Sequence, residues 1–424
     1  MTANLQSLLG LLVFPLIAWL LAGRRERLSP REAIVLVAIG VGLQFLVAGA
    51  FLVVPQLKSV FGLLAAAVAA LQEATKAGMV VVFGYLAGGP APFETASPQN
   101  SFVLATQALP LILVVSVLSR LLYHFGILQR IIGFFAWCLE KTLGVSGPLG
   151  TATAANIFVG MVEAPLLVRP YVAGMSRGAL FATMTAGMAT VAGTVLALYA
   201  AILEPTVPGA AGHVLVASVM SAPAAIVIAR LMVPWRSGED VEAEPVVVAE
   251  ERGSVMGAIA EGTADGLRLL VSVAAMLVVM VSLVALVNMV LAVLPSPFSD
   301  GSALTVELMF GWLAAPLAWL TGVPAGDAVA AGQLIGVKTV LNEFLAYLQL
   351  AATPAEALTE RSRVILTYVL CGFANPGSLG IMTGGLIAMA PERRADILAL
   401  GPLSLVAGTL ATLMTGAVVG VITW

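Results

Sequence analysis

Long apolar segments, separated by short polar ones, follow one another along almost the whole chain. The first two, Leu5–Ala22 and Ala33–Val54, each reach the roughly 18 apolar residues with which a helix crosses a bilayer. Six further segments predict six further spans: Phe102–Leu122, Leu180–Leu203, Val214–Met232, Leu267–Leu294, Val364–Met389 and Ile397–Ile422. The pattern predicts an all-α polytopic membrane protein with eight transmembrane helices.

The composition excludes a water-soluble globular protein. Of the 424 residues, 60% are hydrophobic and only 10% are charged, and the mean hydropathy is +1.03. A soluble domain needs more charge to cover its surface, so lipid must solvate many of these side chains. Leu5–Ala22 has no basic residue before it and no small-residue cleavage site, so we expect a retained first helix rather than a signal peptide.

Basic residues fall on one side of the membrane in nearly every loop. The first span is followed directly by Arg24, Arg25, Arg27 and Arg31, and a tight later loop holds Arg393 and Arg394. Loops rich in arginine stay in the cytoplasm, so both termini are predicted to lie outside. The amphipathic run Leu57–Lys76 is then predicted to be external, and the acidic linker at 236–263 cytoplasmic.

Two apolar stretches remain outside this count, Gly147–Pro170 and Gly322–Leu350. A full span through either would break the topology that the arginines support, whereas two half-helices that enter and leave on one side preserve it. We therefore predict two re-entrant hairpins, the first open to the cytoplasm and the second to the exterior. The span after each hairpin carries small and hydroxyl-bearing residues in its middle, at Ala186–Thr194 and Cys371–Gly380, which predicts a local break.

The order of an amphipathic helix, a charged hairpin, a broken helix and a plain helix thus occurs twice, with opposite orientations. Inverted repeats with discontinuous helices are typical of secondary transporters, whose substrate and ion sites lie near the midplane. A charged side chain at membrane depth costs at least about 2.5–3.5 kcal/mol. Glu163 and Glu343 are therefore predicted to be membrane-buried groups of a site for a small polar solute, and Lys338 to neutralise Glu343 or to cap carbonyls.

Three segments resemble the signatures of the concentrative nucleoside transporters. They read AANIFVGMVEAPLLVRPY at Ala154–Tyr171, GVKTVLNEFLAY at Gly336–Tyr347 and CGFANPGSLGI at Cys371–Ile381. The resemblance covers essentially the whole chain and matches the shorter bacterial form with eight spans. It implies cation-coupled uptake of nucleosides across the inner membrane by alternating access, with both termini periplasmic.

The resemblance also implies a homotrimer, each protomer having a scaffold and a transport domain that moves like an elevator. The expected division is scaffold helices with the external amphipathic helix (1–124), first transport repeat (125–235), acidic linker (236–263), scaffold span six (264–300) and second transport repeat (301–424).

The resemblance further implies a sodium site between the first hairpin and the broken fourth span. Its expected ligands are the side-chain oxygens of Asn156 and Thr190 and the carbonyls of Val159 and Val191. Such oxygens suit a hard cation. Some bacterial relatives use protons instead, and Glu163 or Glu343 would then carry the proton. No cofactor beyond the coupling ion is expected.

The sugar end of the implied nucleoside site consists of Glu343, Asn375 and Ser378, with Phe373 packed against the solute. A carboxylate can accept from two ribose hydroxyls, and an amide can donate and accept. The base end departs from the family. Many members carry Gln-Thr-Glu at the first hairpin tip, where this chain has Met161, Val162 and Glu163.

Methionine and valine cannot form the hydrogen bonds of that Gln-Thr pair, so only Glu163 remains to read a base. Purine-preferring relatives carry methionine at the position of Met161, and a flexible thioether suits a larger flat ring. The hypothesis is therefore a preference for purine nucleosides, or broad selectivity.

The sequence leaves two alternative functions. One is a proton-coupled transporter of another nucleoside-like solute. The other is an intramembrane enzyme that uses Glu163 and Glu343 as an acid/base pair. The enzyme is disfavoured because the chain has no nucleophile–base grouping, no metal-ligand spacing and no phosphate-binding glycine loop. Neither the net charge of −3 nor any basic stripe indicates a nucleic-acid partner.

Overall fold

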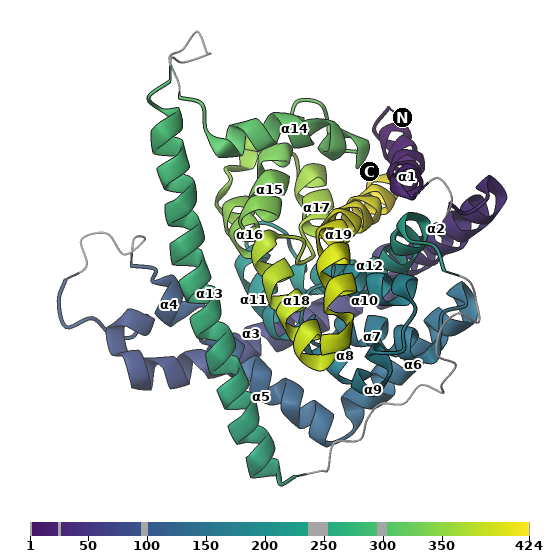
Figure 1. The fold of residues 1–424 in the computed structure, drawn as a ribbon. Coiled ribbons are helices and arrows are strands. Elements are labelled where there is room, and N and C mark those ends of the chain that lie inside the picture. Colours follow the sequence, from purple (N-terminus) through teal and green to yellow (C-terminus); the bar gives the residue numbers. More distant parts are fainter. Residues whose placement is uncertain (1, 24–26, 95–100, 236–252, 295–302, 424) are drawn as a thin grey trace.

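The computed structural model describes residues 2–23, 27–94, 101–235, 253–294 and 303–423, and these residues form helices and loops without a strand (Figure 1). The long helices are α1 (Thr2–Leu21), α2 (Pro30–Val53), α3 (Pro55–Phe83), α12 (Ala210–Met232), α13 (Val255–Leu291) and α19 (Arg394–Ile422). The shorter helices outside the hairpins and the broken spans are η1 (Gly84–Ala87), α4 (Leu104–Gln107), α5 (Leu111–His124), α6 (Ile127–Leu143), α14 (Val306–Leu320), η3 (Ala355–Ala357) and η4 (Pro391–Arg393). The predicted all-α polytopic fold is confirmed.

Eight helical segments among the described residues are long and apolar enough to cross a membrane. The number of segments agrees with the prediction, but one of the eight segments is not a predicted span. Predicted span seven is not among the eight, since only its second half, Pro376–Met389, is an apolar helix and it is too short, and Gly62–Ala87, which includes most of α3, takes its place in the count. Figure 1 draws α3 across the upright α13 rather than along it. The external position predicted for Leu57–Lys76 stays a prediction.

Both predicted hairpins are present, each built from short helices. The first consists of α7 (Gly147–Asn156), a turn, and the single-turn helices α8 (Glu163–Leu166) and α9 (Arg169–Val172). The second consists of α15 (Ala328–Val340) and α16 (Glu343–Ala352).

The helix after each hairpin is interrupted, as predicted. One pair is α10 (Arg177–Ala189) with α11 (Gly193–Leu203), and the other is α17 (Glu360–Val369) with α18 (Pro376–Met389). In the second break Asn375 caps α18, and Pro376 occupies its first turn, where a missing N–H costs nothing.

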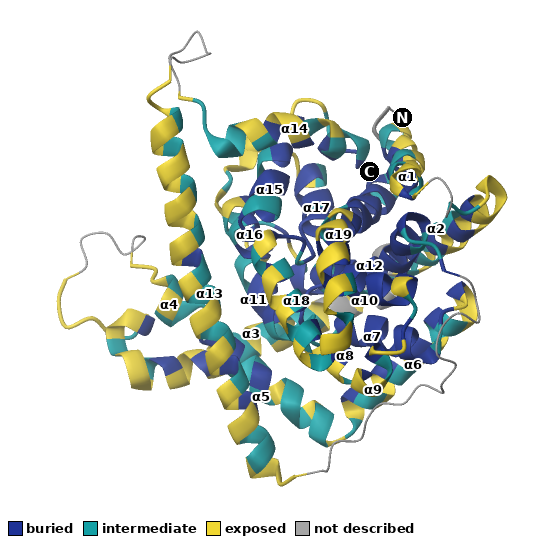
Figure 2. Ribbon diagram, viewed as in Figure 1, coloured by how far each residue is buried: buried dark blue, intermediate teal, exposed yellow. Residues whose placement is uncertain are grey.

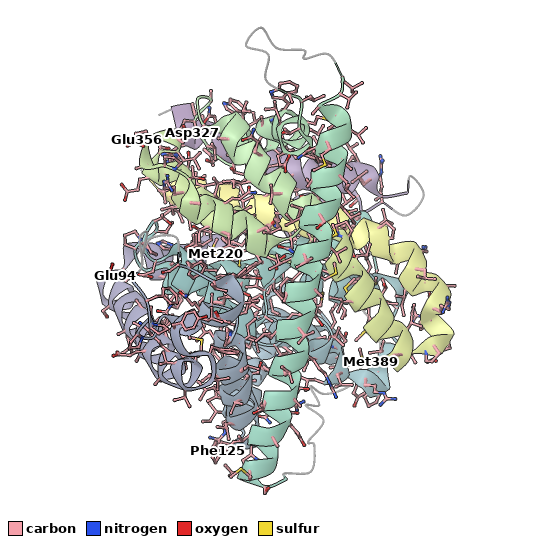
Figure 3. All side chains as sticks on the ribbon, turned by 90° about the vertical axis from the view of Figure 1, so that its left-hand side faces the viewer. Glu94, Phe125, Met220, Asp327, Glu356 and Met389 are labelled. Atoms are coloured by element: carbon pink, nitrogen blue, oxygen red, sulfur yellow. The ribbon has the colours of Figure 1, made fainter. Side chains whose placement is uncertain are left out.

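The two repeats lie at opposite ends of the molecule. In Figure 1, α14 and α15 stand at the upper end and α8 and α9 at the lower end. Figure 3 places Asp327 and Glu356, on either side of the second hairpin, at one end, and Phe125, just before the first repeat, at the other. Both termini lie at the upper end in Figure 1. This arrangement agrees with inverted repeats whose hairpins open in opposite directions.

Burial separates a core from a periphery (Figure 2). In α12, 83% of the residues of the apolar window are buried inside the molecule, compared with 6% in α13. An apolar helix this exposed needs lipid or another apolar partner around it. The helix also begins at Val255, so the end of the predicted linker is helical, while residues 236–252 lie outside the described residues.

An arginine donates hydrogen bonds to carbonyls at the C-terminal end of each hairpin. Arg363 donates to the carbonyls of Leu350, Thr353 and Pro354 at the end of α16. Arg393, which the sequence marks only as a loop arginine, donates to the carbonyls beyond α9, at Ala173 and Met175. These bonds satisfy carbonyls that a helix leaves unpaired at its C-terminal end.

Candidate functional site

A cavity of about 340 Å³ lies where the two hairpin tips and the two helix breaks meet helices α5 and α13. All the residues predicted to bind the solute line it: Met161, Val162, Glu163, Glu343, Phe373, Asn375 and Ser378. These residues come from positions up to 217 apart in the sequence, and the fold brings them to one cavity.

Glu343 is an acidic group of the cavity whose carboxylate is buried and hydrogen-bonded at both oxygens. It is 5% exposed and occupies the first turn of α16, where the helix dipole favours a carboxylate. Its Oε1 accepts a hydrogen bond from the Tyr199 hydroxyl at 2.7 Å, and its Oε2 accepts one from Asn375 Nδ2 at 3.1 Å. Each oxygen can accept a second bond, so the carboxylate retains capacity for two donors of a solute.

Asn375 is fixed at both ends of its amide. While Nδ2 donates to Glu343, Oδ1 accepts from the backbone N–H of Ser378 at 2.8 Å and so caps α18. The cap on α16 is similar, because Asn342 Oδ1 accepts from the N–H of Leu345 at 2.9 Å. Both asparagines therefore stand at the N-termini of half-helices beside the cavity.

Tyr199 belongs to the site although the sequence analysis missed it. Its side chain on α11 is 2% exposed, lines the cavity and donates to Glu343. The ring centroid of Tyr347 lies 4.9 Å away, and the Tyr347 hydroxyl donates instead to the Thr367 carbonyl at 2.8 Å. One signal was present: a tyrosine in the apolar run GTVLALYAAIL must find a polar partner once buried.

Lys338 has the structural role that was expected for it. It is 1% exposed, and its Nζ donates to the Val369 carbonyl at 2.7 Å and to Thr412 Oγ1 at 2.9 Å. Val369 is the last residue of α17, so the ammonium caps the carbonyl end of the broken helix. Of the two predicted options, carbonyl capping is the one these bonds support.

Glu163 differs from Glu343, since it is exposed rather than buried. Its side chain faces the cavity, so its position at membrane depth stays a prediction. Its carboxylate folds back over Gly160, where a Cβ atom would lie 2.1 Å from Oε2. Room for an open carboxylate at the tip thus depends on a glycine three residues earlier.

Met161 and Val162 pack the first hairpin tip against two helices. A Cβ atom at Gly187 of α10 would lie 3.0 Å from the Met161 Cβ, and one at Gly385 of α18 would lie 2.8 Å from a Val162 methyl. Both tip residues also line the cavity, which gives this side of the wall an apolar surface.

The four predicted cation ligands flank the turn after α7 and the break after α10. Asn156 and Thr190 are each 1% exposed, and Val191 is fully buried. A Cβ atom at Gly187 would lie 3.7 Å from Asn156 Oδ1. The N–H of Gly193 donates to the Phe158 carbonyl at 3.0 Å, which joins the break to the turn.

The Asn156 side chain supports a cation here. Its Nδ2 donates to the Ala152 carbonyl at 3.0 Å, which turns Oδ1 the other way, and Oδ1 is a buried acceptor without a hydrogen-bond partner. Thr190 Oγ1 donates to the Ala186 carbonyl at 2.8 Å, so its lone pairs can point outward. Neutral oxygen ligands of this kind fit a hard monovalent cation.

The opposite wall of the cavity belongs to α5 and α13. Arg120 and Asp265 face each other there, and Arg120 Nη2 lies 2.8 Å from Asp265 Oδ2. Arg268, one turn further along α13, has an 83% exposed side chain and is not among the residues that line the cavity.

Three family models match the chain. One, described as Na+ dependent nucleoside transporter N-terminus, matches residues 9–86, and one, described as nucleoside recognition, matches 105–206. The third, described as Na+ dependent nucleoside transporter C-terminus, matches residues 213–420. Together they include every predicted site residue.

Curated relatives of the chain are also transporters. An uncharacterized transporter of Haemophilus influenzae is 39% identical over 98% of this chain and 97% of that protein. The nucleoside permease NupC of Helicobacter pylori is 34% identical over 99% of this chain and 97% of the permease. Human solute carrier family 28 member 3 is 33% identical over 90% of this chain and 55% of the human protein.

Solved structures of CNTnw are similar over nearly the whole chain. Its inward-facing substrate-bound state matches with a TM-score of 0.86 and 36% identity, covering 99% of this chain and 98% of that one. An outward-facing variant matches with a TM-score of 0.87 and 35% identity, covering 100% and 98%. Because both states match about equally, the similarity concerns the fold and not one conformation.

Proposed function

The chain belongs to the concentrative nucleoside transporter family, and on that premise we propose that it couples the entry of sodium to nucleoside uptake across the bacterial inner membrane. It is a transporter and not an enzyme. The observation that carries the proposal is Glu343, an acidic group held at a cavity wall between Tyr199 and Asn375.

The ribose binds at Glu343, Asn375 and Ser378. Two hydroxyls on adjacent carbons can each donate to one oxygen of a carboxylate that already accepts one protein hydrogen bond per oxygen. A site built this way rejects an analogue without the hydroxyls, because its buried polar groups would be left unpaired. Phe373, also in the lining, packs against the solute.

The base faces Met161, Val162 and Glu163. Two of these side chains are apolar, so they accommodate a flat ring by shape and dispersion rather than by reading its polar edge. This favours purine nucleosides or broad selectivity, with Glu163 as the one hydrogen-bonding group of the tip.

Sodium binds at Asn156, Val159, Thr190 and Val191. The unpartnered Oδ1 of Asn156 supports this assignment, since a buried acceptor without a donor is costly unless an ion or water satisfies it. Binding of the ion would also tie the first hairpin to α10 and α11, and so couple the ion to the shape of the cavity.

Transport proceeds by alternating access of an elevator-type transport domain. Residues 125–235 and 301–424 form the moving part, residues 1–124 and 264–300 form the scaffold, and residues 236–263 connect them on the cytoplasmic side. The exposed apolar surface of α13 supports a homotrimer as well as lipid contact. Both termini are then periplasmic.

The test is uptake into proteoliposomes that contain the purified protein. Adenosine, inosine, uridine and cytidine are supplied with a sodium gradient, with a proton gradient or with neither, and the recovered solute is analysed chemically. We expect accumulation of unchanged nucleoside only with sodium, competition by purines at least equal to that by pyrimidines, and no uptake by Glu343→Gln. Strong uridine preference would contradict the purine hypothesis, and recovery of a modified solute would contradict transport itself.

A second candidate is proton-coupled transport of another nucleoside-like solute. Glu163 favours it, because an exposed carboxylate at a hairpin tip can take up and release a proton as the cavity opens to either side. In this case the proton gradient alone would drive uptake, and Glu163→Gln would abolish it.

A further inference from the structure

The cavity has a second polar region, on the scaffold wall. Arg120 on α5 donates from Nε and Nη2 to Oδ2 of Asp265 on α13, at 3.0 and 2.8 Å. Both residues line the cavity, together with Ser119 and Tyr123 of α5. Oδ1 of Asp265 lies 3.9 Å from the exposed Arg268, too far for a hydrogen bond, and so can accept one from a solute.

Backbone contact holds this pair in place. A Cβ atom at Gly262 would lie 2.7 Å from the Cα of Val117, and one at Gly266 would lie 2.9 Å from the Cα of Leu113. Glycines spaced four apart allow two membrane helices to approach this closely. The α5–α13 contact therefore does not depend on the ion pair alone.

The pair is displaced along α13 from the sugar end of the cavity. Helix α13 reaches the sugar end at Met276, whose Cε would lie 2.9 Å from a Cβ atom at Gly377, beside Asn375. Asp265 precedes Met276 by eleven residues on the same uninterrupted helix, or about 16 Å. The pair is thus a polar region separate along α13 from the residues at the sugar end.

The chemistry of the region suits a nucleobase. Arg120 is a planar donor, Asp265 an acceptor, Ser119 a hydroxyl and Tyr123 an aromatic surface, and the charges of the pair cancel. A base can stack on an aromatic or guanidinium plane while its edge accepts from one partner and donates to the other. An anionic or cationic solute would gain no net attraction from the pair.

We propose that Arg120 and Asp265 form a transit subsite for the base of the nucleoside, occupied between its binding at Glu343 and its passage out of the cavity. The proposal rests on the proposed function, since it concerns the same solute in the same cavity. It makes Arg120 a residue that sets the rate of transport without setting the affinity of the Glu343 site.

The experiment compares Arg120→Gln and Asp265→Asn with Arg268→Gln, a matched control that also loses a charge beside Asp265 but lies outside the cavity lining. Two quantities are measured for each purified protein: the dissociation constant at equilibrium and the maximal exchange rate in proteoliposomes. The solutes are inosine and purine riboside, which lacks the six-oxo acceptor. Thermal unfolding in detergent checks that each variant is folded.

We expect Arg120→Gln to slow inosine exchange about fivefold to tenfold, the effect of one hydrogen bond, with the dissociation constant changed less than about twofold. Purine riboside exchange should fall by less, and Asp265→Asn should behave similarly. Unchanged rates in both variants would overturn the proposal. So would equal losses for both solutes, a matching loss in Arg268→Gln, or a dissociation constant that rises as much as the rate falls. If the unmodified protein transports no nucleoside, the proposed function fails instead, which is a separate result.

Discussion

Replacing Tyr199 by phenylalanine removes one hydroxyl from the site and leaves the ring. The hydroxyl donates to Glu343 Oε1 at 2.7 Å inside the protein, and the ring keeps its contact with Tyr347 at 4.9 Å between centroids. A hydrogen bond to a charged group is worth about 1.5–3 kcal/mol, or roughly 10-fold to 100-fold in affinity if Glu343 is misoriented without it. Since cavity water can replace part of this bond, we expect the lower end, about tenfold.

The assay is equilibrium binding of a ribonucleoside and of the corresponding 2′,3′-dideoxynucleoside to purified protein. We expect Tyr199→Phe to weaken ribonucleoside binding about tenfold and dideoxynucleoside binding less than about twofold, because only the former has hydroxyls for Glu343. Tyr347→Phe is the matched control. It also deletes a buried hydroxyl beside Tyr199, but one that donates to the Thr367 carbonyl and not to Glu343.

The reasoning would be refuted in either of two ways. Equal weakening of both ligands by Tyr199→Phe would mean that the hydroxyl supports the fold of the cavity and not the sugar contact. Equal effects of Tyr199→Phe and Tyr347→Phe would mean that the bond to Glu343 has no special part in binding.

Three further substitutions test other parts of the structure. Asn156→Leu should abolish the stimulation of uptake by sodium and the rise in melting temperature with sodium, since it removes the unpartnered buried acceptor. Lys338→Met should lower the free energy of unfolding by about 1–3 kcal/mol, because an α17 carbonyl loses its donor, as denaturant titration in detergent would measure. Burial raises the pKa of Asp327, but hydrogen bonds from Ser362 and Thr359 lower it by more, so its net pKa lies below the ordinary value. The carboxylate therefore stabilises the fold fully at neutral pH and loses this effect on acidification. Asp327→Asn should have a lower melting temperature than the unmodified protein at pH 7, and its melting temperature should fall less when the pH is lowered.

The helix breaks and hairpins could be predicted because their causes are local. Pro376 removes a backbone donor and the neighbouring glycine tolerates the geometry, so α18 begins where the sequence places a break. A charge such as Glu343 in an apolar stretch is equally visible along the chain, and its cost in lipid implies a partner inside the protein.

The partners could not be predicted, because they come from distant segments. Tyr199 and Glu343 are 144 residues apart, and Arg120 and Asp265 are 145 apart. Nothing in the local pattern distinguishes Arg120 from an arginine that marks a loop. Likewise, the exposure of Glu163 depends on how the hairpin tip sits against Gly187 and Gly385, which periodicity does not reveal.

The two repeats use the same type of element but satisfy its polar groups differently. In the second repeat, the Oδ1 atoms of Asn342 and Asn375 accept the capping hydrogen bonds of α16 and α18, and Asn375 Nδ2 donates to Glu343. In the first repeat, Asn156 Oδ1 remains a buried acceptor without a donor. The second repeat thus satisfies its two cap oxygens from its own backbone, and its Glu343 is held from both repeats, by Asn375 and by Tyr199 of α11. In the first repeat, a cation at the proposed site would supply positive charge to the open oxygen of Asn156, and this difference is a physical reason for proposing the ion site in one repeat and the sugar site in the other.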